Sequence, residues 1–350
     1  MTPSSAVEGR DEVPPMPPAE VTNPDISVAL CTFNGEKFLE EQLESIMRQS
    51  VLPREIVISD DGSTDGTRAL VDRVLTPQRL AEHGIRLTVL TRKKPLGVTK
   101  NFEAALAACS AEFVSLCDQD DVWHTNRLER LVSAFESPDV MLVHSDARMI
   151  DANGRPMRHS LLESLSARRR ELRREQGAEG FTVLVRRNLV TGATAMVRRS
   201  LVSAAQPFPE SWVHDHWLAI VAALTGRLVL VPEKLIDYRQ HGANQIGAVK
   251  LSAAGAVEIL GQSRRLRHEA RVERIAELNR RLLEGDVPSS EDQRDFVTAK
   301  LTHEKVRLAM PNSRIARWGT VLRELVTGRY HRLSRGFIDV VRDALSASEE

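Results

Sequence analysis

Apolar and polar positions form alternating blocks along the first half of the chain. Strand-like runs such as "ISVALCTF" from Ile26 and "EIVISDDGST" from Glu55 are each followed by a segment with apolar residues at helical spacing, such as "KFLEEQLESIMRQ". The same order recurs in "IRLTVLTR", "VTKNFEAALAAC", "EFVSLC" and "HTNRLERLVSAF". Continuous short apolar runs are typical of buried strands, and a 3.6-residue spacing is typical of helices. The pattern predicts an α/β fold with a mostly parallel sheet flanked by helices.

From Val140 onward the pattern is less regular. "VMLVHSDARMIDANGR" predicts a strand and a returning strand joined at an Asn-Gly turn, and "DHWLAIVAALTG" predicts a helix that ends at Gly226. The last hundred residues are helical in pattern and rich in charge, whereas the first two dozen are rich in proline and lack an apolar run. We therefore expect a disordered tail over 1–24, an α/β domain over 25–248 and a helical extension over 249–350.

Composition narrows the class of protein. The chain has 350 residues, 42% of them hydrophobic, with 48 basic and 48 acidic side chains, so no overall charge favours binding to nucleic acid. Cys31, Cys109 and Cys117 lie inside apolar segments and form no CxxC pair, which is typical of reduced thiols in a cytosolic protein. The longest apolar stretch, from Trp217, is interrupted by a Gly-Arg pair and is too short for the ~20 residues of a membrane-spanning helix.

Polar residues gather where three of the predicted strands end. They are Thr32–Asn34 after the first strand, Asp60–Asp61 after the second and Asp118–Asp121 after the fourth. Ligands of open α/β sheets bind outside the carboxyl ends of the strands, so we expect these groups to share one crevice. The carboxylates of "CDQDDVW" repel one another unless a cation lies between them, water surrounds them or one stays protonated. Mg²⁺ or Mn²⁺ suits such oxygen ligands, although a solvated loop, and an ordinary polar turn at "SDDGSTDGT", remain alternatives.

Four segments appear together in an order that resembles a known family. "VALCTFNGEKFLEEQLESIMRQS", "ISDDGSTDGT", "FVSLCDQDDVW" and "YRQHGANQIG" resemble the inverting family 2 glycosyltransferases of GT-A fold, especially the bacterial rhamnosyltransferase-like members. The resemblance covers the chain from Ile26 to about Gly247. It implies a glycosyltransferase that uses Mg²⁺ or Mn²⁺ and a nucleoside-diphosphate sugar, with dTDP-rhamnose as the first choice and a UDP-sugar as another. The implied acceptor is a hydroxyl of a cell-surface glycan or lipid-linked saccharide, at a cytoplasmic site that includes the inner face of the plasma membrane.

The resemblance also implies roles for particular residues. A nucleotide-binding role falls on Thr32, Phe33, Asn34, Glu36, Asp60, Asp61, Lys100, Asn101 and Asp118. Among these, Asp60 is expected to meet the base or ribose and Asp61 to support its loop. Asp120 is expected to bind the metal directly, and Asp118 to bind the ribose or a metal-bound water. His241 either completes the metal shell or is an ordinary exposed loop histidine.

The segment "SWVHDHW" is the expected place of the catalytic base. Its local pattern favours Asp215 as the N-cap of an apolar helix, whereas the resemblance makes it the carboxylate that takes the acceptor proton. His214 departs from the family pattern, in which another acid usually precedes the base. Trp123 and Trp217 lie near the proposed site residues, where each could stack on the acceptor sugar or pack in the core.

Two other functions compete with sugar transfer. His214 favours a non-catalytic GT-A scaffold that binds nucleotide without chemistry, and an acidic crevice would also suit a nucleotidyltransferase. The nucleotidyltransferase is disfavoured because the sequence shows no Gly-rich triphosphate loop with Lys or Arg near its start. The basic and apolar segment from Arg314 to Leu345 could contact an anionic membrane or form a packed helical subdomain. Its glycines, at 319, 328 and 336, would break a long helix and favour packing.

Overall fold

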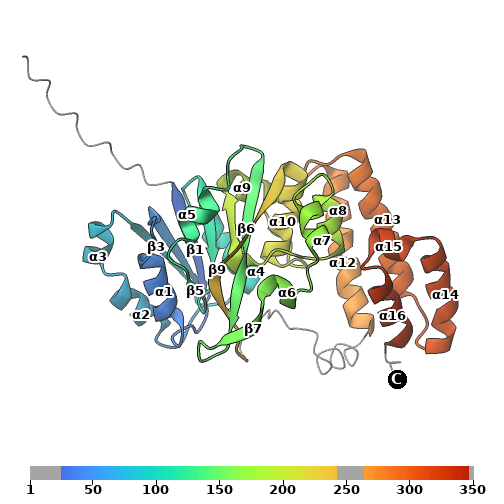
Figure 1. The fold of residues 1–350 in the computed structure, drawn as a ribbon, viewed down its shortest axis with the longest axis horizontal. Helices are drawn as coiled ribbons and strands as arrows, with labels where there is room; N and C mark the ends of the chain where they lie inside the picture. Colours follow the sequence, from blue (N-terminus) through green and yellow to red (C-terminus); the bar gives the residue numbers. More distant parts are fainter. Residues whose placement is uncertain (1–24, 243–263, 347–350) are drawn as a thin grey trace, which may run out of the picture.

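The computed structural model describes residues 25–242 and 264–346. The expected tail over 1–24 and the expected domain boundary near residue 248 lie outside these ranges. A sheet flanked by helices forms one part of the molecule, and a group of C-terminal helices forms the opposite end (Figure 1). Within the described ranges, no helix has the length and apolar character needed to cross a bilayer.

Nine strands of the described chain form one sheet with the order β3-β2-β1-β4-β8-β6-β9-β5, and β7 pairs with β6. Their bounds are β1 Ile26–Thr32, β2 Glu55–Asp60, β3 Arg86–Thr91, β4 Phe113–Cys117, β5 Val122–Trp123, β6 Val140–Ile150, β7 Pro156–Ser160, β8 Ala195–Arg198 and β9 Arg227–Arg239. The strands β3, β2, β1 and β4 are all parallel, as the first half of the sequence predicts. The other half is mixed, because β8 runs antiparallel to β4 and β6 whereas β9 runs parallel to β6.

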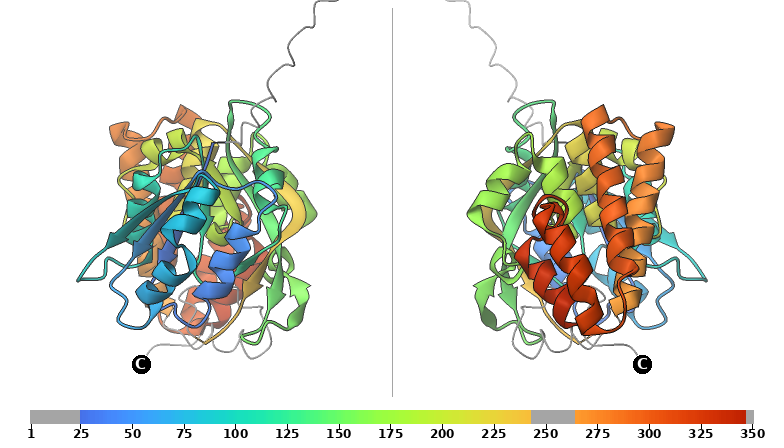
Figure 2. Two further views of the ribbon diagram at one scale, coloured as in Figure 1. Left: turned by 90° about the vertical axis from the view of Figure 1, so that its left-hand side faces the viewer. Right: turned by 90° about the vertical axis from the view of Figure 1, so that its right-hand side faces the viewer.

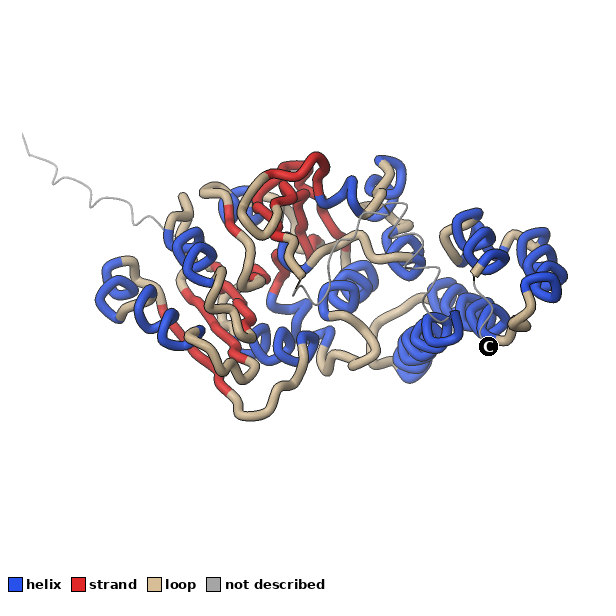
Figure 3. Tube along the Cα trace, turned by 90° about the horizontal axis from the view of Figure 1, so that it is seen from below, coloured by secondary structure: helices blue, strands red, loops and turns tan. Residues whose placement is uncertain are grey.

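Helices cover both faces of the sheet, as Figure 3 shows from below. Those before the extension are α1 Leu39–Met47, α2 Thr67–Val74, α3 Pro77–Glu82, α4 Val98–Ala108, α5 Arg127–Val132, α6 Leu161–Ser164, α7 Arg169–Glu175, α8 Gly180–Arg186, α9 Arg199–Ala205 and α10 His214–Thr225, with a 3₁₀ turn η1 over Gly192–Thr194. Alternate residues of β1 enter two different cores: Val28 and Leu30 pack with α1, whereas Ala29 and Cys31 pack with α4. This period of two is why β1, buried on both faces, carries apolar residues at successive positions from Val28 to Cys31.

The C-terminal helices form two layers at the end of the molecule away from β3 (Figure 2). They are α12 Arg264–Glu284, α13 Glu291–Leu308, α14 Arg314–Val326, α15 Arg329–Leu333 and α16 Phe337–Leu345. Leu278 of α12 and Val297 of α13 belong to the same apolar core as Trp217 of α10, so these two helices are part of the main body. The outer helices α14–α16 have a small core of their own: Met310, Val321, Tyr330 and Val340. Two of the three glycines separate helices as expected, but the glycine at 319 lies inside α14.

A buried ionic network joins α13 to the outer helices. The guanidinium of Arg307 is fully buried and donates from Nε to Asp343 Oδ2 at 2.6 Å and from Nη1 to Glu304 Oε1 at 3.1 Å. His303 Nδ1 lies 2.8 Å from Glu324 Oε2. Although burial opposes its ionisation, the pKa of Glu304 is well below its usual range because of the Arg307 charge. Asp339 and Asp343 of α16 thus point inward toward the buried Arg307, and Glu324 of α14 points inward toward His303.

Candidate active site

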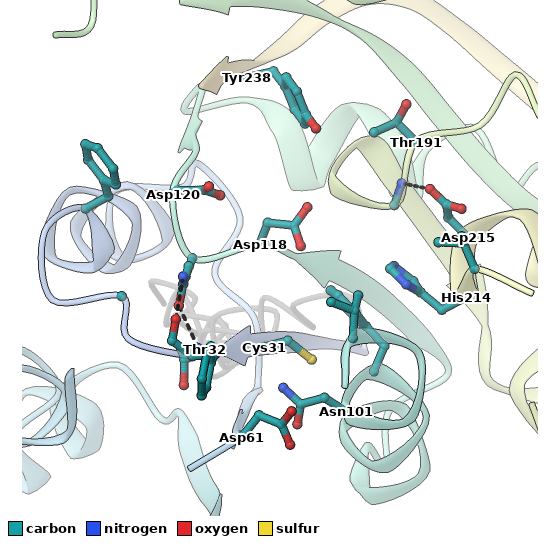
Figure 4. Close-up of a pocket in the computed structure, with 18 of the residues that line it drawn as sticks. Cys31, Thr32, Asp61, Asn101, Asp118, Asp120, Thr191, His214, Asp215 and Tyr238 are labelled. Atoms are coloured by element: carbon teal, nitrogen blue, oxygen red, sulfur yellow. Dashed lines mark hydrogen bonds between the residues drawn. The ribbon is translucent and has the colours of Figure 1, made fainter. Parts of the chain in front are cut away.

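A cavity of about 900 Å³ opens at the carboxyl ends of β1 and β4 (Figure 4). This volume is within the usual range for small-molecule sites. The cavity brings together residues that are far apart in the sequence but were predicted to share a crevice. Those that line it are Thr32, Phe33, Asn34, Asp61, Asn101, Asp118, Asp120, Asp215 and His241.

The chain after β1 is held against the acidic loop by one side chain. Gln119 accepts a hydrogen bond from the Phe33 backbone N–H at 2.8 Å and donates one to the Phe33 carbonyl at 3.1 Å. A Cβ on Gly35 would lie 2.3 Å from Gln119 Oε1, so a larger residue at this position would displace the Gln119 amide from Phe33. Asn34 has a φ of 49°, and its side-chain oxygen accepts from the Thr64 backbone N–H at 2.9 Å. Together these contacts fix the wall on which Thr32, Phe33 and Asn34 were expected to hold a nucleotide.

Asp60 and Asp61, at the end of β2, differ in whether they face the cavity. Asp61, not Asp60, lines the cavity, and its two oxygens accept from the backbone N–H groups of Leu96 and Gly97, each at 2.9 Å. Asp60 is buried behind the wall, where Thr32 Oγ1 donates to it at 2.9 Å. Asp60 was expected to meet the base or ribose and Asp61 to support its loop, and that assignment stays a prediction although Asp61 is the one that faces the cavity. Successive residues of a strand face opposite sides, and only one of the pair can face the cavity.

Two more predicted residues lie away from the cavity. The Glu36 carboxylate accepts from the Gly66 backbone N–H at 2.9 Å and so supports the turn before α2. The Lys100 ammonium donates to Glu103 Oε2 and to the Phe208 carbonyl, both at 2.7 Å. Neither lines the cavity, so their nucleotide-binding roles stay predictions without support from this geometry. Asn101, the neighbour of Lys100 on α4, does line it, because successive helix residues point about 100° apart.

The loop after β4 concentrates negative charge in a partly buried place. Burial raises the pKa of Asp118 to about 8, with further contributions from the charges of Asp120 and Asp215. Burial and the same neighbours also raise the pKa of Asp121 well above its usual range. Asp121 Oδ1 accepts from the Arg239 backbone N–H at 3.0 Å, but Oδ2 is buried and has no hydrogen-bond partner in the described residues. Without a cation beside them, burial and mutual repulsion therefore favour the protonated forms of Asp118 and Asp121.

The donor groups at this loop fit a hard divalent cation. His241 Nε2 lies 2.7 Å from Asp120 Oδ2, so an imidazole and a carboxylate meet at the cavity wall beside Asp118. Over residues 25–242 and 264–346, no group of three or more His, Cys, Asp or Glu side chains is arranged to hold a metal ion by itself. Mg²⁺ typically takes one or two carboxylates and completes its shell with water and substrate phosphates. A cation at this place would be bound by protein side chains together with water and substrate phosphates.

Asp215 lies across the cavity from the acidic loop, in the first turn of α10 (Figure 4). Its carboxylate accepts hydrogen bonds from the Gly192 backbone N–H at 3.0 Å, from Asn188 Nδ2 at 3.1 Å and from the His216 backbone N–H at 2.5 Å. Burial raises the pKa of Asp215 to about 6, and these three donors oppose the rise. The helix begins one residue earlier, so Asp215 is not the N-cap that its local pattern favours. The arrangement is that of a positioned carboxylate that can accept a proton near neutral pH.

His214 packs beside this carboxylate as a neutral ring. It stacks on Phe102 with ring centroids 3.9 Å apart and an interplanar angle of 15°. Burial lowers the pKa of His214 to about 3, and both ring nitrogens lack hydrogen-bond partners in the described part of the chain. A second carboxylate at this position would repel Asp215 and raise its pKa further. The histidine therefore leaves the Asp215 carboxylate easier to ionise than an acidic pair would.

Three groups near Asp215 have no signal in the sequence. Asn188 lies between α8 and η1, and Gly192 contributes only its backbone N–H, so no local pattern marks either residue. Arg274 lines the cavity from α12, although that helix follows Asp215 by about fifty residues and belongs to the extension. Its carbonyl accepts from Trp212 Nε1 at 3.0 Å. The extension thus completes the wall of the cavity.

The two tryptophans near the site belong to the core. Trp217 is fully buried and donates from Nε1 to the Ala205 carbonyl at 2.7 Å. Trp123 is buried under the guanidinium of Arg127, which lies 3.9 Å from the ring centroid. Neither ring can stack on an acceptor sugar in this structure. The packing alternative holds for both.

Comparisons with known proteins agree with this geometry. Residues 27–204 match the family model described as "Glycosyl transferase family 2". An uncharacterized glycosyltransferase of Nostoc sp. is 34% identical over 128 residues, which cover 37% of this chain and 38% of that protein. The Escherichia coli UDP-Glc:alpha-D-GlcNAc-diphosphoundecaprenol beta-1,3-glucosyltransferase WfgD is 25% identical over 37% of this chain and 47% of its own length. The chain thus spans less than half the length of either relative.

Solved structures share the fold over most of the chain. Staphylococcus aureus TarS 1–349 in complex with UDP-GlcNAc has a TM-score of 0.51 at 19% identity and covers 93% of this chain and 82% of its own. The mannosyltransferase PcManGT of Pyrobaculum calidifontis, in complex with GDP-Man and Mn²⁺, has a TM-score of 0.50 at 19% identity and covers 92% and 78%. These similarities confirm a GT-A fold with a C-terminal helical region. The matched family segment, which includes the strands and loops of the acidic wall, shows that the chain belongs to glycosyl transferase family 2.

Proposed function

We propose that the protein is a metal-dependent inverting glycosyltransferase. It transfers a sugar from a nucleoside-diphosphate donor to a hydroxyl of a surface glycan or lipid-linked saccharide. The observation that carries the proposal is the placement of Asp215, a hydrogen-bonded carboxylate across one cavity from Asp118 and Asp120. A scaffold that only binds nucleotide has no need for a carboxylate held by three hydrogen-bond donors on the side of the cavity opposite the acidic loop.

In the proposed reaction the donor diphosphate lies toward the acidic loop and the sugar toward Asp215. The acceptor oxygen attacks the anomeric carbon from the side opposite the diphosphate, and Asp215 takes its proton. The new C–O bond forms as the bond from the anomeric carbon to the phosphate oxygen breaks, and that electron pair leaves with the nucleoside diphosphate. One direct displacement inverts the anomeric configuration. Asn188 and the Gly192 N–H hold the Asp215 carboxylate in place during the transfer.

Asp120, His241 and Asp118 are the residues that would hold the cation. A divalent cation at this place would offset the negative charge that develops on the leaving diphosphate. Two observations support a cation at this place. It would offset the buried oxygen of Asp121 that has no hydrogen-bond partner in the described residues, and it would favour the ionised form of Asp118, whose pKa is raised. Thr32, Phe33, Asn34, Asp61 and Asn101 form the wall that would receive the nucleoside.

The choice of donor is the first test of this function. Thermal unfolding is measured with UDP, dTDP, GDP, CDP and ADP, each with and without Mn²⁺ or Mg²⁺. A ligand that binds only the folded state raises the melting temperature, so we expect a rise of about 2 °C or more with one nucleotide at ~100 times its dissociation constant. The rise should require the metal. A selective response to dTDP supports rhamnose, the donor sugar suggested by "CDQDDVW", whereas no response to any nucleotide contradicts the proposed function.

The pH dependence of transfer tests the role of Asp215. A general base works only when deprotonated, and the pKa of Asp215 in this structure is about 6. We therefore expect kcat/KM to reach half its plateau at about pH 6, the plateau itself about one unit higher, and a fall of about tenfold per pH unit well below pH 6. Initial rates over about pH 5 to 9, at saturating metal and with the folded fraction checked at each pH, give this profile. A rate that does not depend on pH in this range would exclude a base of this kind.

A further inference from the structure

The outer helices of the extension expose an apolar surface that no described part of the chain covers. On α14 the exposed large apolar residues are Ile315, Trp318, Leu322 and Val326, and on α16 they are Phe337, Ile338, Val341 and Leu345. Ile315 and Val326 are each 85% exposed and Phe337 is 65% exposed. The two helices lie beside each other at the end of the molecule farthest from β3 (Figures 1 and 2). We call this set of eight side chains the outer apolar face.

The spacing shows that the outer apolar face is distinct from the side that packs inward. On α14 the exposed residues recur every three or four positions and so form one stripe, whereas the buried Arg317, Val321 and Glu324 form another. α16 likewise buries Asp339, Val340, Asp343 and Ala344 and exposes its large apolar residues. Each helix therefore has one side in the small core and a second apolar side in solvent. Scattered apolar residues on a surface are normal, but eight on two neighbouring helices indicate an interaction site.

The exposed charges carried by the outer helices themselves are of one sign. Between residues 311 and 346 the only acids are Glu324, Asp339 and Asp343, and all three are buried. Arg307 pairs with Asp339 and Asp343, and Arg329 pairs with Glu324. The exposed charged side chains of the same segment are Arg314, Arg323, Arg329 and Arg332. Arg314 and Arg323 lie next to the apolar stripe of α14, one near each end. An apolar stripe bordered by arginines, with Trp318 in it, is typical of surfaces that enter the headgroup region of a bilayer.

We propose that the outer apolar face binds the surface of an anionic lipid bilayer. Its apolar side chains enter the boundary between headgroups and acyl chains, and the bordering arginines contact lipid phosphates. A second copy of the chain is a poorer occupant, because a two-fold contact through this face would bring the arginines of both copies together. The proposal does not depend on sugar transfer, since the face lies outside the cavity and needs no nucleotide.

Vesicle binding by the full chain tests this proposal. Without any nucleotide, we expect the protein to sediment with phosphatidylglycerol–phosphatidylcholine vesicles and not with pure phosphatidylcholine vesicles. Binding should weaken as salt is raised, since salt screens the attraction of arginine to the anionic surface. Ile315→Asp and Phe337→Asp, each in the first turn of its helix where an acid is tolerated, should each lower vesicle affinity about tenfold or more.

The matched control is Leu283→Asp, which adds the same charge at a leucine of α12 that is 63% exposed and outside the face. It should bind vesicles as the unchanged protein does, although its place in the last turn of α12 lowers the melting temperature slightly, whereas the two first-turn variants should keep that temperature. Three results would overturn the proposal: no sedimentation with anionic vesicles, an equal loss of binding in Leu283→Asp, or a dimer in solution that Ile315→Asp dissociates. The last result would identify the face as a contact between copies.

Discussion

Replacing Asp215 by asparagine is expected to lower the transfer rate by ~10²–10⁴-fold, which is the usual contribution of a general base. The asparagine amide keeps the size of the side chain, and its oxygen can still accept from Asn188 and the His216 N–H, which share Oδ1 in the natural chain, but it cannot take the acceptor proton. Donor affinity should change little, because Asp215 lies across the cavity from the proposed diphosphate site. The rate is measured as nucleoside diphosphate released in the presence of acceptor, and donor affinity as the nucleotide-induced thermal shift.

The control for this variant is Asp286→Asn, a change of the same kind at an exposed aspartate of the extension. It should leave both the rate and the thermal shift unchanged. If Asp215→Asn retains full activity, the base lies elsewhere. If the natural chain binds donor but transfers no sugar, the scaffold alternative suggested by His214 becomes the better account.

Replacing Asp120 by asparagine is expected to abolish the metal-dependent part of donor binding. Loss of an outer-shell partner of a metal typically costs ~10–100-fold in metal affinity or activity, so loss of a direct ligand should lower turnover at least ~100-fold. The change also removes the carboxylate that meets His241 at 2.7 Å, so the imidazole loses its partner in the proposed shell. The measurement is a titration of Mn²⁺ against the thermal shift produced by the best nucleotide.

Two variants control this experiment. His241→Ala removes the second proposed ligand and should weaken the response to Mn²⁺ less than Asp120→Asn does, because the carboxylate carries the charge. Asp139→Asn, at an exposed aspartate paired with Arg227, should have no effect. A nucleotide response that is equally strong without metal, and unchanged in Asp120→Asn, would show that the nucleotide binds without a cation.

The sequence predicts most of the acidic wall because that wall depends on strand order. A block of apolar residues followed by polar ones marks where β1, β2 and β4 end, and parallel pairing brings those ends to one edge. Side chains are harder to place than loops. Asp60 and Asp61 are adjacent, as are Lys100 and Asn101, and which of each pair faces the cavity depends on register and helix rotation that local sequence does not fix.

The wall around Asp215 is less predictable for another reason. Asn188 lies in a connection, Gly192 acts through its backbone, and Arg274 arrives through the packing of α12 on α10. None of these contacts follows from periodicity, because each depends on how distant elements dock. The sequence did mark Asp215 itself, but only through resemblance, since its local pattern favours a cap that the structure does not form.

The position of Arg274 indicates that the family domain and the helical extension form one functional unit. The family match ends at residue 204, yet the cavity wall continues through α10 and into α12. A chain cut before α12 would leave the Trp212 indole N–H without its carbonyl and would open the cavity to water beside Asp215. It would also expose the apolar surface of α10 that Leu278 covers. An excised family domain would therefore differ from the intact protein in how far water reaches Asp215 and in the electrostatic environment of its carboxylate.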